Sequence, residues 1–263
     1  MSGSMKELVV VSGKGGTGKT SIAACLAALH KNTLSADCDV DASNLHLVLK
    51  PRILEKHEFS AGHSARIRSE QCARCGICLE VCRFEAVLSL GDGQVEIDKI
   101  ACGGCGVCAH FCPEKAIDLV QTVSGEWFIS KARTGPMVHA RPGIAKEKSG
   151  KLVTIIRKEA RKLAQEKGCS LLVVDGSPGI GCPVIASMIG ADMALLVAEA
   201  TISGLHDIER VADLASQLRV EAAVCINKWD LNEEVTVKIE SLAEKRGMLL
   251  AGRVRYDNAV TDA

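Results

Sequence analysis

Eight of the thirteen cysteines lie between residues 72 and 112, in two runs of identical spacing. The first C-x2-C-x2-C-x3-C run consists of Cys72, Cys75, Cys78 and Cys82. The second run, 30 residues later, consists of Cys102, Cys105, Cys108 and Cys112. This spacing is typical of thiolate ligands that hold an iron–sulfur cluster. It therefore constrains both the local fold and the chemistry of this stretch.

The repeat extends beyond the cysteines. Ile67 corresponds to Ile97, and Ala86 corresponds to Ala116. We expect a short strand before each cysteine run and a short apolar segment after it. From roughly residue 66 to residue 121, cysteines, glycines and charged residues dominate, which indicates a duplicated insert within a longer domain.

The cysteines are not expected to form disulfides. A secreted chain with this cysteine content would suggest them, but a short polar N-terminus leads directly into Glu7–Val11. The sequence has no signal peptide and no apolar run of about 18 residues. We therefore expect a reducing, cytoplasmic compartment, in which the cysteines are metal ligands or free thiols.

Overall composition favours an α/β domain of 263 residues that is 47% hydrophobic but only 3% aromatic. Aliphatic side chains would fill the core of a buried parallel sheet. Lys and Arg number 32, as do Asp and Glu, so the formal net charge is zero. This balance argues against nucleic-acid binding, and the lack of an amphipathic C-terminal helix argues against a membrane partner.

Outside the cysteine stretch, short apolar runs alternate with helical segments. Strands are expected at Leu8–Ser12, Thr33–Asp37, Ser170–Asp175, Met193–Val197 and Ala222–Asn227. Helices are expected from residue 20 to about 30, at Leu152–Lys167 and at His206–Leu218. The alternation predicts a doubly wound parallel sheet, with one domain formed by 5–63 and 123–263 and an inserted domain at 64–122.

A glycine-rich loop follows the first strand and opens the first helix. Its glycines allow the backbone N–H groups to approach a phosphate closely. Lys19 should reach the β- and γ-phosphates of ATP, and Thr20 should bind Mg²⁺. The predicted nucleotide-binding residues of this loop are Gly13, Lys14, Gly15, Gly16, Thr17, Gly18, Lys19, Thr20 and Ser21.

The second lysine of the loop, Lys14, resembles the signature lysine of the MinD/ParA/Mrp superfamily and the nitrogenase iron protein. In that family it crosses a dimer interface to the partner's nucleotide; the alternative is a solvated loop lysine. The resemblance covers residues 5–260. It implies a slow ATPase that works as a homodimer through its nucleotide face.

Three further motifs carry the same resemblance. Residues 37–41 resemble switch I, in which Asp39 would position the attacking water, so the implied catalytic residues are Lys14, Lys19 and Asp39. Residues 175–179 resemble Walker B and switch II, with Asp175 holding Mg²⁺ through water. Asn227 and Lys228 resemble the adenine-contacting position; the alternative for Asn227 is an ordinary strand-end cap.

The insert resembles a bacterial-type ferredoxin with two [4Fe–4S] clusters, in which the fourth cysteine of each run binds the other cluster. The resemblance implies one ligand set of Cys72, Cys75, Cys78 and Cys112, and a second of Cys82, Cys102, Cys105 and Cys108. Pro113 follows the motif, whereas Arg83 replaces the expected proline. Structural zinc is the alternative, but zinc sites usually use two separated C-x2-C pairs.

Four of the five other cysteines fall into two groups. Cys25, Cys169 and Cys225 are expected to be buried small hydrophobic residues. Cys182 lies seven residues after Asp175, the offset of a cluster ligand in the nitrogenase iron protein. Two copies could hold a metal at a dimer axis, with His139 as a candidate for completing the site; the alternatives are an inert cysteine and an ordinary loop histidine.

Two function classes follow from the resemblance to MinD-superfamily ATPases with an inserted ferredoxin domain. One is an ATP-gated electron-transfer protein, and the other is an ATP-dependent carrier or assembly factor for metal cofactors. Both imply a redox or metallocofactor protein as partner. The basic stretch Lys131–Lys151 could dock an acidic redox protein or simply be a solvated connection.

Overall fold

The computed structural model describes residues 5–142 and 149–262, which form two compact units. The large unit comprises the described parts of Met1–His57, Trp127–Arg141 and Ser149–Ala263. The small unit comprises Glu58–Glu126 and the described part of Pro142–Lys148. The small unit is therefore inserted between segments of the large one along the chain.

In the described residues, the main sheet has nine strands in the order β11-β10-β9-β1-β8-β2-β7-β6-β3. All pairings from β11 to β7 are parallel. These strands are β1 (Lys6–Ser12), β2 (Thr33–Asp37), β7 (Gly135–Pro142), β8 (Leu171–Pro178), β9 (Met193–Glu199), β10 (Glu221–Asn227) and β11 (Leu249–Val254). The expected α/β fold with a mostly parallel sheet is confirmed.

Two long strands complete the sheet. β3 (Arg52–Ile67) and β6 (Ile117–Ala132) are neighbours; β3 runs from the large unit into the small unit, and β6 runs from the small unit back into the large one. Only residues 133–134 separate β6 from β7, and such a short connection joins antiparallel strands. The two connections between the large unit and the small unit are thus adjacent strands of the sheet.

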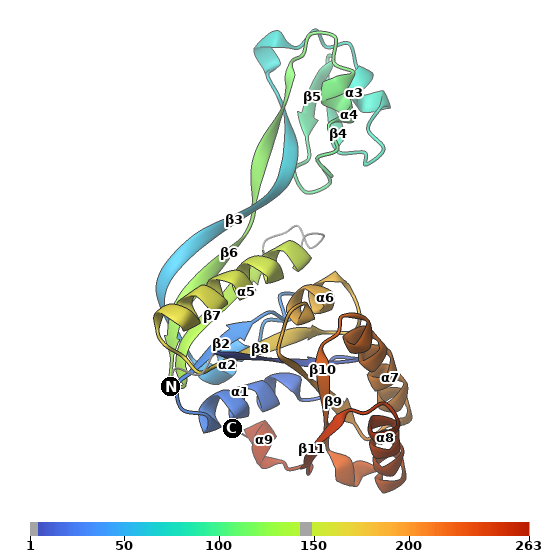
Figure 1. Cartoon of the computed structure of the whole chain (residues 1–263). Helices are drawn as coiled ribbons and strands as arrows, with labels where there is room; N and C mark the ends of the chain where they lie inside the picture. The colour runs from blue at the N-terminus through green and yellow to red at the C-terminus, as the bar shows by residue number, and fades with distance from the viewer. Residues whose placement is uncertain (1–4, 143–148, 263) are drawn as a thin grey trace. The chain divides into compact units, whose positions relative to one another are not determined.

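Helices cover both faces of the sheet in the large unit. α1 (Lys19–Leu29) packs on one face, where Ala23 joins the core residues Val10 and Val173. α5 (Ser149–Glu166) and α6 (Cys182–Met188) pack on each other and on the opposite face (Figure 1). The other helices are α2 (Leu45–Leu49), α7 (Ile202–Gln217), α8 (Glu233–Lys245) and α9 (Ala259–Asp262), with a 3-10 turn at Trp229–Leu231.

The stretch Lys131–Lys151 is not one surface connection, so that prediction is wrong for part of its length. Gly135–Pro142 forms β7, which pairs with β2, and Met137 and Val138 are fully buried. The apolar run is too short, and too closely flanked by Gly, Pro and Arg, to be recognised as a strand. Residues 143–148 lie outside the described part of the chain.

The small unit repeats in structure as it does in sequence. α3 (Ile77–Glu80) follows Gly76 and α4 (Val107–His110) follows Gly106, and both glycines are left-handed, with φ of 78° and 79°. An antiparallel hairpin, β4 (Val87–Gly91) and β5 (Gln94–Ile97), precedes the second half. A 3-10 turn at Ser69–Gln71 leads from β3 into the first cysteine run.

Candidate functional site

The glycine-rich loop connects β1 to α1 and is shaped by close approaches of its backbone. A Cβ on Gly13 would lie 2.3 Å from Cβ of Asp207, so only glycine fits there. Gly16 and Gly18 are left-handed, with φ of 80° and 87°. A Cβ at Gly15 or Gly16 would meet no atom within 4 Å, so the loop has an open side through which a phosphate could reach its N–H groups.

Lys19 lies between two carboxylates at the base of this loop. Its Nζ is 3.0 Å from Oδ2 of Asp39 and 2.8 Å from Oδ1 of Asp175, and all three side chains are buried. Burial works against the charged ammonium, but Asp175 and then Asp39 raise the pKa of Lys19 on balance. The lysine therefore stays charged where a phosphate would bind.

The other oxygen of each carboxylate, Oδ1 of Asp39 and Oδ2 of Asp175, is buried and has no hydrogen-bond partner among the described residues. Burial raises the pKa of Asp175, although Lys19 and Thr20 act in the opposite direction. Buried carboxylate oxygens without a donor fit a hydrated divalent cation, which is the chemistry expected of Mg²⁺. The residues present therefore fit the implied ion.

A third carboxylate, Asp37, belongs to the same site although the sequence analysis gave it no role. At the end of β2 it pairs in register with Asp175 of β8. It accepts hydrogen bonds from Oγ of Ser43 at 2.7 Å and from the N–H groups of Asp39 and Leu45. Burial, and then the charge of Asp175, raise the pKa of Asp37 to about 7.

The position of Asp37 could have indicated its role. It ends a fully buried strand and begins the Asp-Cys-Asp-Val-Asp run. Its carboxylate accepts hydrogen bonds from the backbone N–H groups of Asp39 and Leu45, and so it holds the start of this run. Asp37 therefore positions the segment that carries Asp39.

Asn227 contacts the phosphate loop directly. Its Nδ2 donates to the carbonyl of Thr17 at 2.7 Å, and a Cβ on Gly18 would lie 2.2 Å from that nitrogen. Thr17 itself is buried, with a hydroxyl that has no partner among the described residues. Asn227, at the end of β10, thus holds the loop in place. Ser21, the last of the predicted loop residues, lies on α1 and is partly buried.

Lys14 and Lys228 both reach the carboxylate of Glu199 at the end of β9. Lys228 Nζ lies 2.8 Å from Oε1, and Lys14 Nζ lies 3.2 Å from Oε2. Lys14 also donates to Oγ of Ser203 at 3.0 Å. The hydrogen bond from Lys228 is the main reason why the pKa of Glu199 is lowered. In this chain alone, Lys14 is therefore held by its own subunit.

His139 is not a loop histidine; it lies in β7 and is buried. Its Nε2 is 2.9 Å from Oγ of Ser130, and its ring stacks on Phe128 with 5.1 Å between centroids. Burial, and then the charges of His46 and Arg141, lower its pKa to about 4. These contacts account for the ring of His139 without any metal.

Cys182 is the first residue of α6 and is exposed. Across the described residues, no three His, Cys, Asp or Glu side chains are arranged to hold a single metal ion. Cys169 and Cys225 are buried, as expected. The prediction for Cys25 is wrong: α1 turns Ala23, Ala24 and Ala27 inward and leaves Cys25 exposed.

In the small unit, the cysteines of the two runs line two separate pockets. The first pocket is lined by Cys72, Cys75, Cys78 and Cys112. The second is lined by Cys82, Cys102, Cys105 and Cys108. Each pocket thus takes three cysteines from one run and the fourth from the other run.

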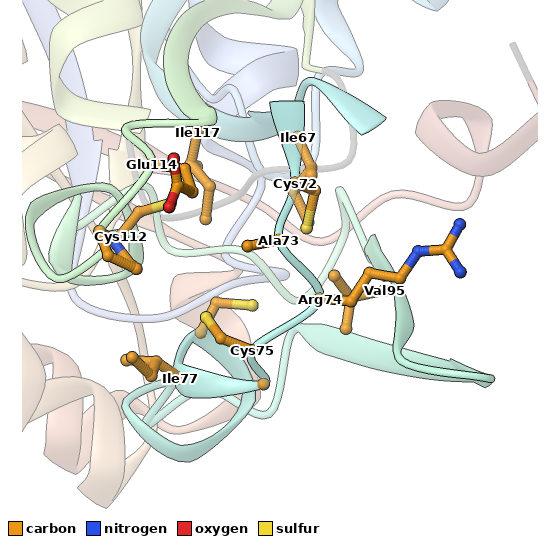
Figure 2. Close-up of a pocket in the computed structure, with 13 residues that line it drawn as sticks. Ile67, Cys72, Ala73, Arg74, Cys75, Ile77, Val95, Cys112, Glu114 and Ile117 are labelled. Atoms are coloured by element: carbon orange, nitrogen blue, oxygen red, sulfur yellow. The ribbon is translucent and has the colours of Figure 1, made fainter. Parts of the chain in front are cut away.

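Apolar side chains and backbone N–H groups surround these pockets. Figure 2 shows Cys72, Cys75 and Cys112 around the first pocket, beside Ile67 and Ile117. N–H groups of Ala65 and Ala116 donate to Sγ of Cys102 at 3.5 Å and of Cys112 at 3.3 Å. Four thiols around a small cavity fit a multi-atom cluster better than a single ion, which needs donors at one point.

A glycine-rich loop between β1 and α1, with a buried lysine and carboxylates at neighbouring strand ends, defines a P-loop nucleotide-binding protein. The chain belongs to the family described as CbiA, the CobQ/CobB/MinD/ParA nucleotide binding domain, whose profile matches residues 8–263. None of the helices in the described ranges is long and apolar enough to span a membrane.

Two curated relatives come from Methanocaldococcus jannaschii. Uncharacterized protein MJ0578 is 34% identical over 234 residues, covering 88% of this chain and 80% of the relative. Uncharacterized protein MJ0579 is 25% identical over 243 residues, covering 87% of this chain and 83% of the relative.

Similar solved structures include MinD from the MinC:MinD complex of Aquifex aeolicus, with a TM-score of 0.55 and 18% identity, covering 98% of this chain and 84% of that one. Another is Pyrococcus horikoshii MinD with Mg-ADP, with a TM-score of 0.54, 15% identity and the same coverages. A third is a variant of Cyanothece McdA in complex with ATP, with a TM-score of 0.53 and 16% identity, covering 98% of this chain and 86% of that one. At these identities the likeness establishes the fold alone.

Proposed function

We propose that this protein binds and hydrolyses ATP and that its nucleotide state controls electron transfer through two [4Fe–4S] clusters held by the small unit. The observation that carries the proposal is the combination of two features in one chain. The first is the site of Lys19, Asp39 and Asp175 beneath the glycine-rich loop. The second is the pair of pockets lined by four cysteines each.

The nucleotide chemistry rests on charge placement. Lys19 would exchange its carboxylate partners for the β- and γ-phosphates of ATP, since it is already charged and lies at the base of the loop. Thr20 would bind Mg²⁺, with Asp175 holding it through water, and Asp39 would position the attacking water. Adenine nucleotide binding is supported by two proteins of similar fold, the P. horikoshii protein in complex with Mg-ADP and the Cyanothece protein in complex with ATP.

Dimerisation would complete the site. Lys14 would leave Glu199 and reach the nucleotide of a second copy, so that hydrolysis and release are coupled to the state of the dimer. The ion pair with the partly buried Glu199 keeps Lys14 at the rim of the loop. Slow, dimer-dependent hydrolysis is the expected behaviour, with homodimer contacts through the nucleotide face.

The inserted domain, residues 64–122, would hold the clusters. Cys72, Cys75, Cys78 and Cys112 would bind one, and Cys82, Cys102, Cys105 and Cys108 the other. When bound, such clusters store and pass single electrons at potentials that depend on hydrogen bonds to sulfur. Ala65 and Ala116 already direct N–H groups at cysteine sulfurs, which is the role expected of them beside a bound cluster.

A second candidate is an ATP-dependent carrier that delivers iron–sulfur clusters or other metal cofactors to a partner. Exposure of Cys75, Cys105 and Cys182 favours it, because a transferable group needs accessible thiolates. The carrier would lose its clusters to an apo-protein in the presence of ATP. An electron-transfer protein would retain them.

Anaerobic purification followed by iron and sulfide analysis tests the first step, and about eight of each per chain are expected for two clusters. Mg·ATP should then alter the EPR spectrum or the reduction potentials of the reduced protein. Iron-free protein that folds normally, or zinc in place of iron, would overturn the proposal. Unaltered spectra together with ATP-dependent cluster loss to an apo-ferredoxin would favour the carrier.

A further inference from the structure

A third hollow of the small unit is a groove between the end of β3 and β5. Its two walls are equivalent segments of the internal repeat: residues 65–67 face residues 95–97 at a sequence offset of 30. Among the eight cysteines of the two runs, only Cys72 lines it. The groove therefore lies at the seam of the repeat and shares lining residues with both cysteine pockets.

The charges on the groove do not follow the repeat. Arg66 corresponds to Glu96, Ser69 corresponds to Lys99, and Arg74 has Gly104 as its equivalent. Arg66, Arg74 and Lys99 thus give the groove three cationic side chains against the single carboxylate of Glu96. The excess of positive charge in the groove is therefore not a consequence of the internal repeat.

These cations are available to a partner. Arg66 is two-thirds exposed, and its ion pair with Asp118 is long, at 3.9 Å. Arg74 donates to the carbonyl of Asp92 over 3.5 Å, which is a weak contact. Within the part of the chain that the structure describes, no carboxylate lies within ion-pair distance of Lys99. An acidic partner would therefore gain charge contacts without breaking strong internal ones.

The backbone of the groove is open apart from the N–H of Ala65, which donates to Sγ of Cys102 at 3.5 Å. β3 is the last strand of its sheet, and β5 pairs only with β4 among the described residues. Consecutive residues of both strands line the groove, whereas side chains on one face of a strand alternate, so strand edges as well as side chains face it. Unpaired strand edges accept an extended segment of another protein.

The second pocket also borders the groove, because Ala65 and Ile97 line both. A Cβ on Gly104 would lie 2.0 Å from the carbonyl oxygen of His63, and the N–H of Ala65 donates to Cys102. Among the eight cysteines, however, it is Cys72 that lines the groove itself.

We infer that this groove is the docking site for an extended, carboxylate-bearing segment of a redox partner protein, which would exchange electrons at the Cys72 side of the small unit. The inference rests on the proposed function for the electron exchange, although the binding itself needs only the groove. Carboxylates would contact Arg66, Arg74 and Lys99, and the segment would pair with the edges of β3 and β5.

The test uses the full chain and a fluorescein-labelled eight-residue peptide of alternating Glu and Val as probe. A Lys-Val peptide of the same length is the control peptide. Fluorescence anisotropy should show binding of the acidic peptide only, weakening as salt rises. The triple variant Arg66→Gln/Arg74→Gln/Lys99→Gln should weaken it about tenfold or more.

A matched variant, Arg83→Gln/Lys115→Gln/Lys238→Gln, removes the same charge outside the groove and should leave the affinity within about twofold. Equal weakening in both variants, equal binding of both peptides, or full displacement by inorganic phosphate would overturn the inference. Iron and sulfide are counted in every sample. Full clusters without peptide binding refute only the docking site, whereas peptide binding to iron-free protein refutes only the proposed cluster function.

Discussion

Lys14 and Glu199 form an ion pair within one subunit, with 3.2 Å between Nζ and Oε2. The lysine that would have to reach a second copy is therefore restrained by its own chain, together with Ser203. Formation of the proposed dimer must break this contact. The strength of the pair then sets part of the free-energy cost of dimerisation.

Replacing Glu199 by Gln should release Lys14 and tighten the Mg·ATP-dependent dimer. The pair is partly exposed, so the expected gain is only about twofold to fivefold in the dimer dissociation constant. Sedimentation equilibrium with a slowly hydrolysed ATP analogue measures it. Glu209→Gln, which removes an exposed carboxylate paired with Arg246, is the control. A weaker dimer in Glu199→Gln would show that Glu199 supports the interface instead.

Removal of the buried ammonium at Lys19 should destabilise the large unit as well as abolish nucleotide binding. Lys19→Met leaves Asp39 and Asp175 buried without their cation, which is expected to cost about 3 kcal/mol of unfolding free energy. Urea denaturation measures this loss. The double variant Lys19→Met/Asp39→Asn should recover part of it, and no recovery would mean that the two groups are not coupled.

The loop entrance offers a steric test with an internal control. Gly13→Ala would place a methyl group 2.3 Å from Cβ of Asp207 and should cost about 1–3 kcal/mol of unfolding free energy. Gly15→Ala meets no atom within 4 Å and should change that free energy by less than about 1 kcal/mol. Thermal unfolding of both variants separates the cases, and equal losses would contradict the packing of α7 against the loop.

His139 should make the unfolding free energy depend on pH. Its folded-state pKa of about 4 lies below the ordinary value of 6.5, so the unfolded chain binds more protons between these values. Stability from this group is complete above pH 6.5 and is lost as pH falls toward 4. His139→Gln, which can still bond to Ser130, should flatten this slope, whereas the exposed His206→Gln should not. Chemical denaturation at about pH 7 and about pH 5 measures the difference.

The two pockets predict an unusual pattern of iron loss. Cys78→Ser and Cys112→Ser come from different cysteine runs but line the same pocket, so each should remove the same cluster. The double variant should then lose no more iron than either single variant. Cys82→Ser should deplete the other cluster, and Cys25→Ser should retain all iron. Additive loss in the Cys78/Cys112 double variant would rule out a shared site.

Much of the sheet was predictable from the sequence because its central strands are continuous apolar runs. Thr33–Asp37 is a strand with the expected bounds, and Met193–Val197 falls within β9. β7 was not recognised, because its buried positions lie between arginine, proline and glycine. The length of β3 was also missed, since polar and charged residues occupy most of its first half.

The site was predictable where a motif is contiguous and was not where contacts are long-range. The glycine-rich loop, Asp39 and Asp175 are recognised from local spacing. Glu199 is not, because its link to Lys14 joins residues that are far apart in the sequence and is set by the position of β9 next to β1. Cys25 was misassigned because an alanine-rich helix gives little indication of which face is buried.

The insertion of the small unit between neighbouring strands has a consequence for biosynthesis. Nearly all residues of the small unit lie within Glu58–Glu126, whereas β1 can pair only after β8 and β9 are synthesised, since Lys6 pairs with Leu171 and Leu8 with Met193. Emerging from the ribosome, the chain should finish its cysteine-rich segment while its first strand is still unpaired. Cofactor loading of the nascent protein could then precede, rather than follow, formation of the nucleotide site.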